Sequence, residues 1–148
     1  MKKKLKIGVI GAGGRGRLAH LAHRPEEGFE LVAGVDTRKE ILQEFKEKFP
    51  EAFVSTDYRE LLEIKEIDAV FITTPDYLHQ EHALAAIEAG KAIYLEKPMT
   101  ITIEGCDEIL KKAKEKNVKI YVGHNMRHMY LILKMKQLID SGIIGEVK

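Results

Sequence analysis

The chain alternates between two hydrophobic patterns along its whole length. Short unbroken apolar runs are typical of strands buried on both faces, and they occur at 5–10, 30–35, 52–55, 68–74, 91–96 and 118–123. Between them, the sequence predicts helices after the glycines of 11–16 and over 37–49, 58–64, 77–89, 102–116 and 129–141. The alternation predicts an α/β fold: a doubly wound parallel sheet, or Rossmann fold, in three α/β/α layers.

Local signals mark several helix boundaries. Thr37, with an acidic residue three positions later, predicts a capping box, and Asp76 and Thr102 predict N-caps. Gly90 and Asn117 predict helix ends, because both residue types adopt the left-handed backbone conformation that closes a helix. The loops that follow the strands are then expected at one edge of the sheet, where ligands bind in such folds.

Composition narrows the functions. The 148 residues favour one domain, 1–148, and a net charge of +1 argues against a nucleic-acid partner or a membrane surface. Cys106, the only cysteine, excludes an internal disulfide, and no apolar run reaches the length of a membrane span. We therefore expect a cytoplasmic protein. The paired histidines at 20/23 and 79/82 lack further ligands at suitable spacing, so we expect no metal.

The stretch "GAGGRG" follows the first predicted strand and opens a helix. Gly11, Gly13 and Gly16 have the G-x-G-x-x-G spacing: the first permits a tight turn, the second lets the backbone approach a pyrophosphate, and the third allows close packing of helix on strand. Gly14 and Arg15 complete the loop. Free N–H groups at the helix start would bind phosphates, so the loop predicts a dinucleotide site.

Asp36 ends the second strand, twenty residues beyond Gly16. A carboxylate there can accept hydrogen bonds from the adenosine ribose, and it would repel a 2′-phosphate, so NAD is favoured. Thr37 and Arg38 follow it, and Arg38 keeps NADP possible because a guanidinium pairs with phosphate. Alternatively, Arg38 is only an exposed residue of the first helical turn. A Rossmann-like methyltransferase also fits these features.

The stretch "TTPDYLHQEHALAAIEAGKAIYLEKPMT" (73–100) is the most distinctive of the chain. It resembles the Gfo/Idh/MocA family of oxidoreductases, and the motifs that carry the resemblance are Thr74-Pro75 with His79, Ala89-Gly90-Lys91 and Glu96-Lys97-Pro98. Their order after a dinucleotide fingerprint argues against a methyltransferase. The resemblance covers essentially the whole chain.

The resemblance implies roles for these residues. Thr73, Thr74 and Pro75 would line the cofactor near adenine and ribose, and Leu78 and His79 would lie beside its nicotinamide half. Glu96 and Lys97 would lie near the nicotinamide ring and substrate, with Lys97 as the catalytic residue that assists proton transfer during hydride transfer. A lysine amine is normally charged, and burial or a neighbouring cation would favour the neutral form that accepts a proton.

Residues after the sixth strand have two interpretations. Arg127 matches an arginine that commonly follows this strand in the family, but Met129 and Tyr130 stand where the family often has a proline. His124 and Asn125 would either border the nicotinamide or form a turn. The chain is therefore expected to bind NAD, with NADP possible, through this edge.

The resemblance implies that a C-terminal α+β domain usually follows; we expect this chain to lack it, and residues 124–148 to be the helix and first residues leading to it. The resemblance implies hydride transfer on a sugar, polyol or related hydroxy compound, weak or absent in this short chain. A non-catalytic NAD(P)-binding sensor or partner subunit is the alternative. The helix at 129–141 is apolar nearly all round, so we expect homo-oligomers through it.

Overall fold

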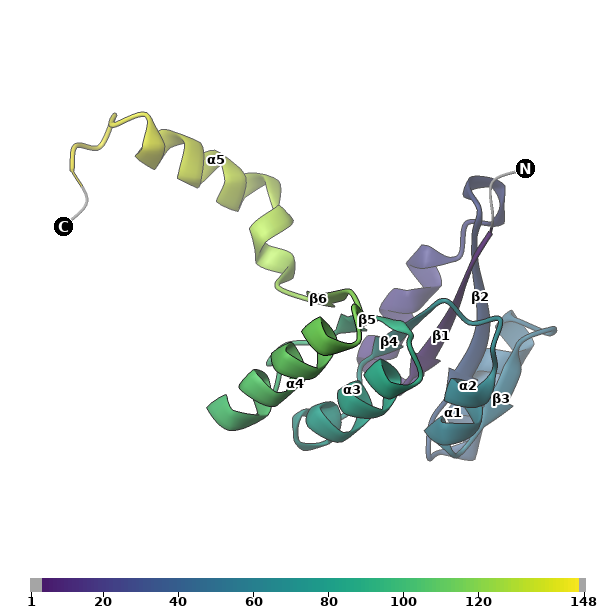
Figure 1. Ribbon diagram of the computed structural model, residues 1–148. Coiled ribbons are helices and arrows are strands. Elements are labelled where there is room, and N and C mark those ends of the chain that lie inside the picture. Colours follow the sequence, from purple (N-terminus) through teal and green to yellow (C-terminus); the bar gives the residue numbers. More distant parts are fainter. Residues whose placement is uncertain (1–3, 147–148) are drawn as a thin grey trace.

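A computed structural model describes residues 4–146 of the protein. Its centre is one sheet of six strands, all parallel, in the order β3-β2-β1-β4-β5-β6 (Figure 1). The strands are β1 Leu5–Ile10, β2 Phe29–Val35, β3 Phe53–Ser55, β4 Ala69–Ile72, β5 Ala92–Leu95 and β6 Ile120–Val122. This is the strand order of the Rossmann fold, which confirms the predicted doubly wound sheet.

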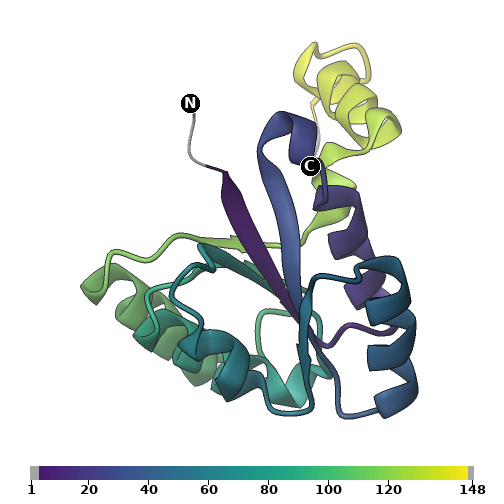
Figure 2. The same ribbon diagram turned by 90° about the vertical axis from the view of Figure 1, so that its right-hand side faces the viewer.

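Helices connect the strands and cover both faces of the sheet. The α-helices are α1 Lys39–Lys48, α2 Tyr58–Glu63, α3 His79–Glu88, α4 Ile103–Glu115 and α5 Tyr130–Asp140. Four 3₁₀ segments are η1 Gly14–Ala22, η2 Pro25–Glu27, η3 Asp76–Leu78 and η4 Asn125–His128. Figure 2 shows α3 and α4 on one side of the sheet and η1 and α1 on the other.

Two apolar cores lie between these layers. The first packs α2, α3 and α4 against one face of the sheet, with Leu61, Ile87 and Ile109 fully buried. The second packs η1 and α1 against the opposite face, with Phe45 of α1 and Phe49 at its C-cap among its largest side chains. The three-layer α/β/α arrangement is therefore confirmed, and it makes the sheet a rigid frame for the loops at its edges.

The pairing register places the carboxyl ends of the strands side by side. Ile10 at the end of β1 pairs with Val35 of β2 and with Ile72 of β4. Ile72 pairs with Leu95 of β5, which in turn pairs with Val122 of β6. Because these last residues are aligned, the loops that follow the strands emerge as one row along a single edge.

Two of the expected helix starts are wrong. α1 begins after Arg38, whose side chain makes no capping bond, so Thr37 does not form a capping box. The backbone N–H of Arg38 instead donates to the carboxylate of Asp36, which holds this segment in the loop. Asp76 starts a short 3₁₀ turn rather than capping α3, because the N–H of Leu78 bonds to the carbonyl oxygen of Pro75.

Other boundary signals are confirmed. Thr102 caps α4 with its side-chain oxygen, which accepts a hydrogen bond of 3.1 Å from the N–H of Gly105. Gly90 and Asn117 both have positive φ, 69° and 53°, directly after α3 and α4. These residues end their helices as the sequence predicts, and the chain turns back into β5 and β6.

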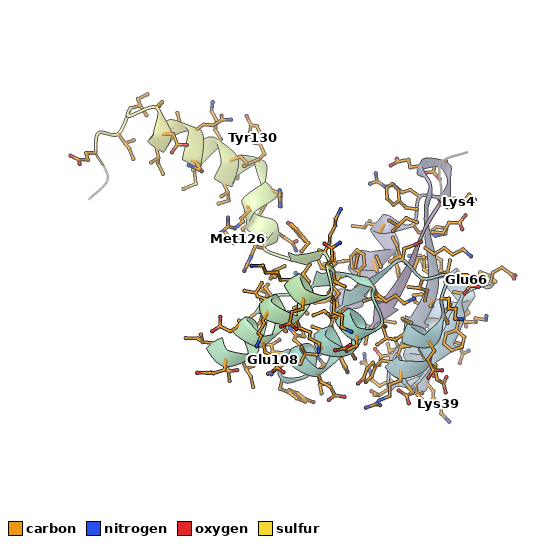
Figure 3. All side chains as sticks on the ribbon, viewed as in Figure 1. Lys4, Lys39, Glu66, Glu108, Met126 and Tyr130 are labelled. Carbon is orange, nitrogen blue, oxygen red and sulfur yellow. The ribbon has the colours of Figure 1, made fainter. Side chains whose placement is uncertain are left out.

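Helix α5 differs from the other helices. It projects away from the sheet, and Figure 3 shows its side chains, Tyr130 among them, extending into open space. None of its residues is buried, and Leu131 is 69% exposed. Within residues 4–146, no helix is long and apolar enough to cross a membrane.

Candidate functional site

The glycine loop between β1 and η1 is held close to its neighbours. Gly11 has φ of +88°, and its N–H donates to the carbonyl oxygen of Val35 over 2.8 Å. A Cβ atom at Gly16 would overlap the carbonyl oxygen of Gly11, so only glycine fits there. The tight turn and the close packing expected from the glycine spacing are both present. The helix that follows, η1, is 3₁₀ rather than α; Gly14 and Gly16 near its start have weak α-helical propensity.

Asp36 lies at the end of β2 and reaches across to the glycine loop. Its Oδ2 accepts a hydrogen bond of 3.0 Å from the N–H of Gly13, and its Oδ1 accepts one of 3.1 Å from the N–H of Arg38. Burial by itself would raise the pKa of this carboxyl, but the bonds from Arg38 and Gly13 outweigh burial and hold the pKa below its usual value. Asp36 is therefore a carboxylate at neutral pH.

Arg38 covers this carboxylate. Its Nε donates to Oδ1 of Asp36 over 3.0 Å, and its Nη2 donates to Oδ2 over 3.2 Å. A Cβ atom at Gly13 would collide with Nη2 of Arg38, so the guanidinium lies directly over the glycine loop. The side chain is still 55% exposed and hence free to turn outward. The pair places a positive and a negative group at the position expected for the adenosine ribose.

A cavity of about 450 Å³ opens at this edge of the sheet. Most of the residues expected to hold a cofactor line it: Gly11, Gly13, Gly14, Arg15, Asp36, Thr37, Arg38, Thr73, Thr74, Pro75 and Leu78. The sequence interpretation missed Ile10, Val35, Thr56, Tyr58, Tyr77 and His82, which also line it. Thr56 and Tyr58 follow β3, so their position after a strand was a usable signal.

The loop after β4 joins the glycine loop to α3. The hydroxyl of Thr73 donates to the carbonyl oxygen of Gly11 over 2.8 Å. The hydroxyl of Thr74 lies 3.0 Å from Nδ1 of His82, whose ring packs 4.3 Å from the ring of Tyr58. Burial lowers the pKa of His82, so this ring is neutral near pH 7. Thr74 and Tyr58 thus form a wall of the cavity that His82 supports.

His79 does not line the cavity. Its side chain is 0% exposed, with Nδ1 2.7 Å from the carbonyl oxygen of Pro98 and Nε2 2.9 Å from that of Thr74. The expected direct contact with the nicotinamide half is therefore not available in this structure, because the ring is enclosed between the two loops. Leu78, its neighbour, lines the first cavity together with Thr74 and Pro75, and not the cavity that holds Lys97.

Glu96 and Lys97 follow β5 and have opposite surroundings. Glu96 is buried, and its Oε1 accepts hydrogen bonds from Arg15 Nη2 at 2.6 Å and from Arg15 Nε at 2.9 Å. Its Oε2 accepts a bond from the N–H of Lys97. The Lys97 side chain is exposed, so the burial expected to favour a neutral amine is absent here, and the bond from Lys97 to Pro98 is cis.

A second cavity of about 370 Å³ lies beside Lys97. It is lined by Arg15, Lys97 and residues 123–127, so it brings Lys97 together with Asn125 and Arg127. Asn125 accepts a hydrogen bond of 3.2 Å from the hydroxyl of Tyr94. Because Arg15 lines both cavities, an elongated ligand that reached from Asp36 to Lys97 would pass along Arg15.

No group of three or more His, Cys, Asp or Glu side chains that could hold a metal ion occurs among residues 4–146. The histidines near the end of η1 have structural contacts: the ring of His20 lies against Phe45 and Phe49, and Nδ1 of His23 accepts a hydrogen bond from the N–H of Leu31. The chemistry available at the strand ends is therefore that of backbone N–H groups, a carboxylate, guanidinium groups and an amine.

Comparison with known proteins connects this geometry to a family. Residues 5–124 match the oxidoreductase family with an NAD-binding Rossmann fold. The chain belongs to the Gfo/Idh/MocA family. It is 35% identical over 145 residues to scyllo-inositol 2-dehydrogenase (NADP(+)) of Bacillus subtilis, covering 97% of this chain and 39% of that protein. The match confirms the resemblance and identifies an NAD(P)-binding oxidoreductase domain.

Two further relatives agree. An inositol 2-dehydrogenase/D-chiro-inositol 3-dehydrogenase of Halalkalibacterium halodurans is 35% identical over 146 residues, covering 96% of this chain and 42% of that protein. A crystal structure of scyllo-inositol dehydrogenase from Lactobacillus casei with bound NAD(H) and scyllo-inositol superimposes with a TM-score of 0.89 at 29% identity, covering 97% of this chain and 43% of that one. The chain spans less than half the length of the curated relatives it matches.

The residues present fit a nicotinamide dinucleotide. The glycine loop, the ionised carboxylate of Asp36 and the first cavity suit the adenosine half, because they offer N–H groups for phosphate and an acceptor for ribose hydroxyls. The second cavity shares Arg15 with the first and holds Lys97, which suits the other half. Together the two cavities have the size range of ordinary ligand sites.

Proposed function

We propose that this chain is the dinucleotide-binding part of an NAD(P)-dependent oxidoreductase that acts by hydride transfer on a sugar, polyol or related hydroxy compound. The observation that carries the proposal is the row of loops along one sheet edge, with Asp36 at one end and Lys97 at the other. Its support is the family match and the relatives named as inositol dehydrogenases.

Each part of the row has its own task in binding. Backbone N–H groups at the start of η1 hold the pyrophosphate, since those of Gly11 and Gly13 already donate to Val35 and Asp36, and Asp36 accepts the ribose hydroxyls once Arg38 turns outward. Thr73, Thr74, Pro75 and Leu78 form the wall of the adenosine half. Glu96 acts indirectly. Its bonds hold the guanidinium of Arg15 and the backbone of Lys97, so Glu96 positions both cationic residues.

Lys97 is the proposed catalytic residue. The bound nicotinamide supplies the acceptor or donor of hydride at its C4 atom. In the oxidation direction, the neutral form of the Lys97 amine would accept the proton of the substrate hydroxyl while a bound nicotinamide would take up the hydride, so that one proton and one hydride leave the alcohol. Asn125 and Arg127, which share the cavity with Lys97, would hold substrate or cofactor oxygens.

Turnover by this chain is proposed to be weak, because catalysis needs a substrate held against the cofactor. The test is NADH binding by calorimetry, followed by NADH formation with a panel of inositols, sugars and polyols. NADH binding together with turnover of any hydroxy compound supports the proposal. Binding with no turnover, together with a specific protein partner, supports the alternative of a non-catalytic sensor or partner subunit. No NADH binding refutes both.

NAD is the proposed cofactor, with NADP accepted less well. Asp36 carries a full negative charge where a 2′-phosphate would lie, and that charge is compensated only by Arg38. The relatives include users of each cofactor: the Bacillus subtilis dehydrogenase is named with NADP(+), and the Lactobacillus casei structure contains NAD(H). Calorimetry with NADH and NADPH tests the preference, and tighter NADPH binding would overturn it.

We also propose that the chain self-associates through α5. Six apolar side chains on this helix are at least 40% exposed: Tyr130, Leu131, Leu133, Met135, Leu138 and Ile139. Together these side chains form a larger exposed apolar surface than single surface hydrophobic residues do. A second copy of the chain would remove this surface from water and so stabilise a dimer. We expect residues 124–148 to lead toward a substrate domain. The last two residues of this segment, 147–148, lie outside the residues that the structure describes.

A further inference from the structure

His79 joins two loops that are far apart in sequence. It begins α3, yet its ring lies between the loop after β4 and the loop after β5. On one side Nε2 is 2.9 Å from the carbonyl oxygen of Thr74, which lines the adenosine cavity. On the other side Nδ1 is 2.7 Å from the carbonyl oxygen of Pro98, next to Lys97. The imidazole therefore spans the two halves of the cofactor site.

The two contacts fix the number of protons on the ring. A carbonyl oxygen only accepts hydrogen bonds, so each contact needs an N–H from His79. A neutral imidazole has one N–H, whereas the imidazolium has two. The His79 ring is 0% exposed, so it has no other partners, and a neutral ring would leave one of its two carbonyl contacts without an N–H donor. Both bonds form together only when His79 carries both protons.

His79 and His82, the two histidines of α3, have different hydrogen-bond partners. His82 contacts the side-chain hydroxyl of Thr74, whereas His79 contacts the backbone carbonyl oxygen of the same residue. Burial lowers the pKa of His82 and outweighs the nearby carboxylate of Glu81, which raises it. The elements that pack against α3 carry these charged groups: Arg59, Glu60 and Glu63 of α2, Asp76 of η3, Glu81 and Glu88 of α3 itself, Glu96 and Lys97 after β5, and Glu104, Asp107, Glu108, Lys111, Lys112, Lys114 and Glu115 of α4. His79 is thus the ring placed between carbonyl acceptors, while His82 stays neutral.

We propose that His79 is a positioning residue that, as a doubly protonated ring, ties the Thr74 loop to the Pro98 loop. It thereby sets the spacing between the adenosine half of the site and the half that contains Lys97. This role rests on the proposed function, because it concerns a ligand that reaches both halves. A ligand that fills the adenosine half alone would not depend on the connection, since Thr74 keeps its bond with His82.

The proton assignment is tested on the wild-type chain without any ligand. Imidazole ¹H–¹⁵N correlation spectra of the labelled protein should show two N–H groups for His79, assigned through its absence in His79→Gln. Both should persist at neutral pH, where a free histidine is mostly neutral. A single N–H on His79 at every pH that the fold tolerates would overturn the proposal.

The positioning role is tested with two ligands. In His79→Gln, the dissociation constant for NADH should rise about tenfold, because a charged bridge between the loops is lost, while that for ADP should change less than about threefold. The ratio of the two constants should rise with pH in the wild type and stay flat in the variant. Equal weakening of both ligands would show that His79 is merely structural and overturn the role.

His23 provides the matched control. It also joins two segments through a backbone hydrogen bond, to the N–H of Leu31, but this bond lies near the start of β2, at the opposite edge of the sheet. In His23→Gln the ratio of NADH to ADP affinity should equal that of the wild type. A wild-type chain with two N–H groups on His79 but no NADH binding would refute the proposed function and the coupling role, while the proton assignment would stand.

Discussion

The two halves of the cofactor site differ in how completely the chain builds them. The half around Asp36 is enclosed by the loops after four neighbouring strands, and its carboxylate is held by Gly13 and Arg38. The half around Lys97 is lined mainly by residues 123–127 and leaves the lysine side chain exposed. Beyond it the chain continues into α5, none of whose residues is buried.

The groups expected to bind the cofactor and the residue proposed for proton transfer therefore lie in differently supported parts of the sheet edge. The groups that would hold adenosine and pyrophosphate lie in the interior of the sheet edge, where β1, β2 and β4 support them from both sides. Lys97 lies after β5, next to the edge strand β6, with one wall of its cavity formed by a short 3₁₀ segment. We therefore expect substitutions near Asp36 to affect binding strongly and substitutions near Lys97 to affect it little.

The largest effect is expected for Asp36→Ala. The substitution removes the acceptor for the ribose hydroxyls and the partner of Gly13 N–H, so the dissociation constant for NADH should rise about 10- to 100-fold. Asp107→Ala, an exposed acid on α4, is the control and should leave binding unchanged. Calorimetry with thermal melts measures both, and an Asp36→Ala chain that is folded and binds NADH normally would contradict the first half of the comparison.

Leu131→Glu should have the next largest effect, on association rather than binding. A leucine that is 69% exposed in the single chain is expected at the interface, so a charge there should raise the dimer dissociation constant about tenfold or more. Lys134→Glu changes an exposed polar residue of the same helix and serves as control. Sedimentation velocity measures both; a wild-type monomer at high concentration would remove the proposed interface altogether.

Arg38→Ala should change the choice of cofactor. Arg38 is the side chain that can pair with a 2′-phosphate, so NADPH affinity should fall about fivefold to tenfold. NADH affinity should change less than about threefold, because Asp36 becomes free for the ribose. Arg24→Ala, a surface arginine paired with Glu27, is the control. Equal losses for the two cofactors in titrations would argue that Arg38 supports the loop rather than recognises phosphate.

The smallest effect is expected for Lys97→Ala. Its side chain is exposed and has a proposed role in proton transfer, so the dissociation constant for NADH should change less than about threefold. If turnover is detectable, it should be lost in the same variant. Lys119→Ala, before β6, is the control for removing a positive charge. A loss of NADH affinity larger than that of Asp36→Ala would reverse the comparison between the two halves.

Much of the fold could be read from the chain because each signal is local. Six apolar runs, the glycine spacing and the acid after β2 each report what a few neighbouring residues do, and the structure places all of them as expected. The errors were also local. Thr37 and Asp76 looked like helix caps, but Asp36 and Pro75 bind the backbone N–H groups that shape these starts.

The site was predictable only in part. Gly11, Asp36 and Thr74 stand at strand ends, so parallel pairing alone brings them together. Tyr58 and His82 enter the same cavity from helices, and nothing in their spacing shows which helix face meets the loop. The enclosed position of His79 was missed for the same reason, since the residue at its Nδ1 is nineteen positions away.

The sequence by itself determined the order of strands and helices, the glycine loop and the acid beside it, because these depend on residue type and short-range spacing. Only the tertiary structure decided that Arg38 covers Asp36, that Arg15 reaches Glu96 and that His79 joins two loops. In each case the outcome depends on the direction of a side chain across packed layers, and that direction is set by neighbours in space rather than along the chain.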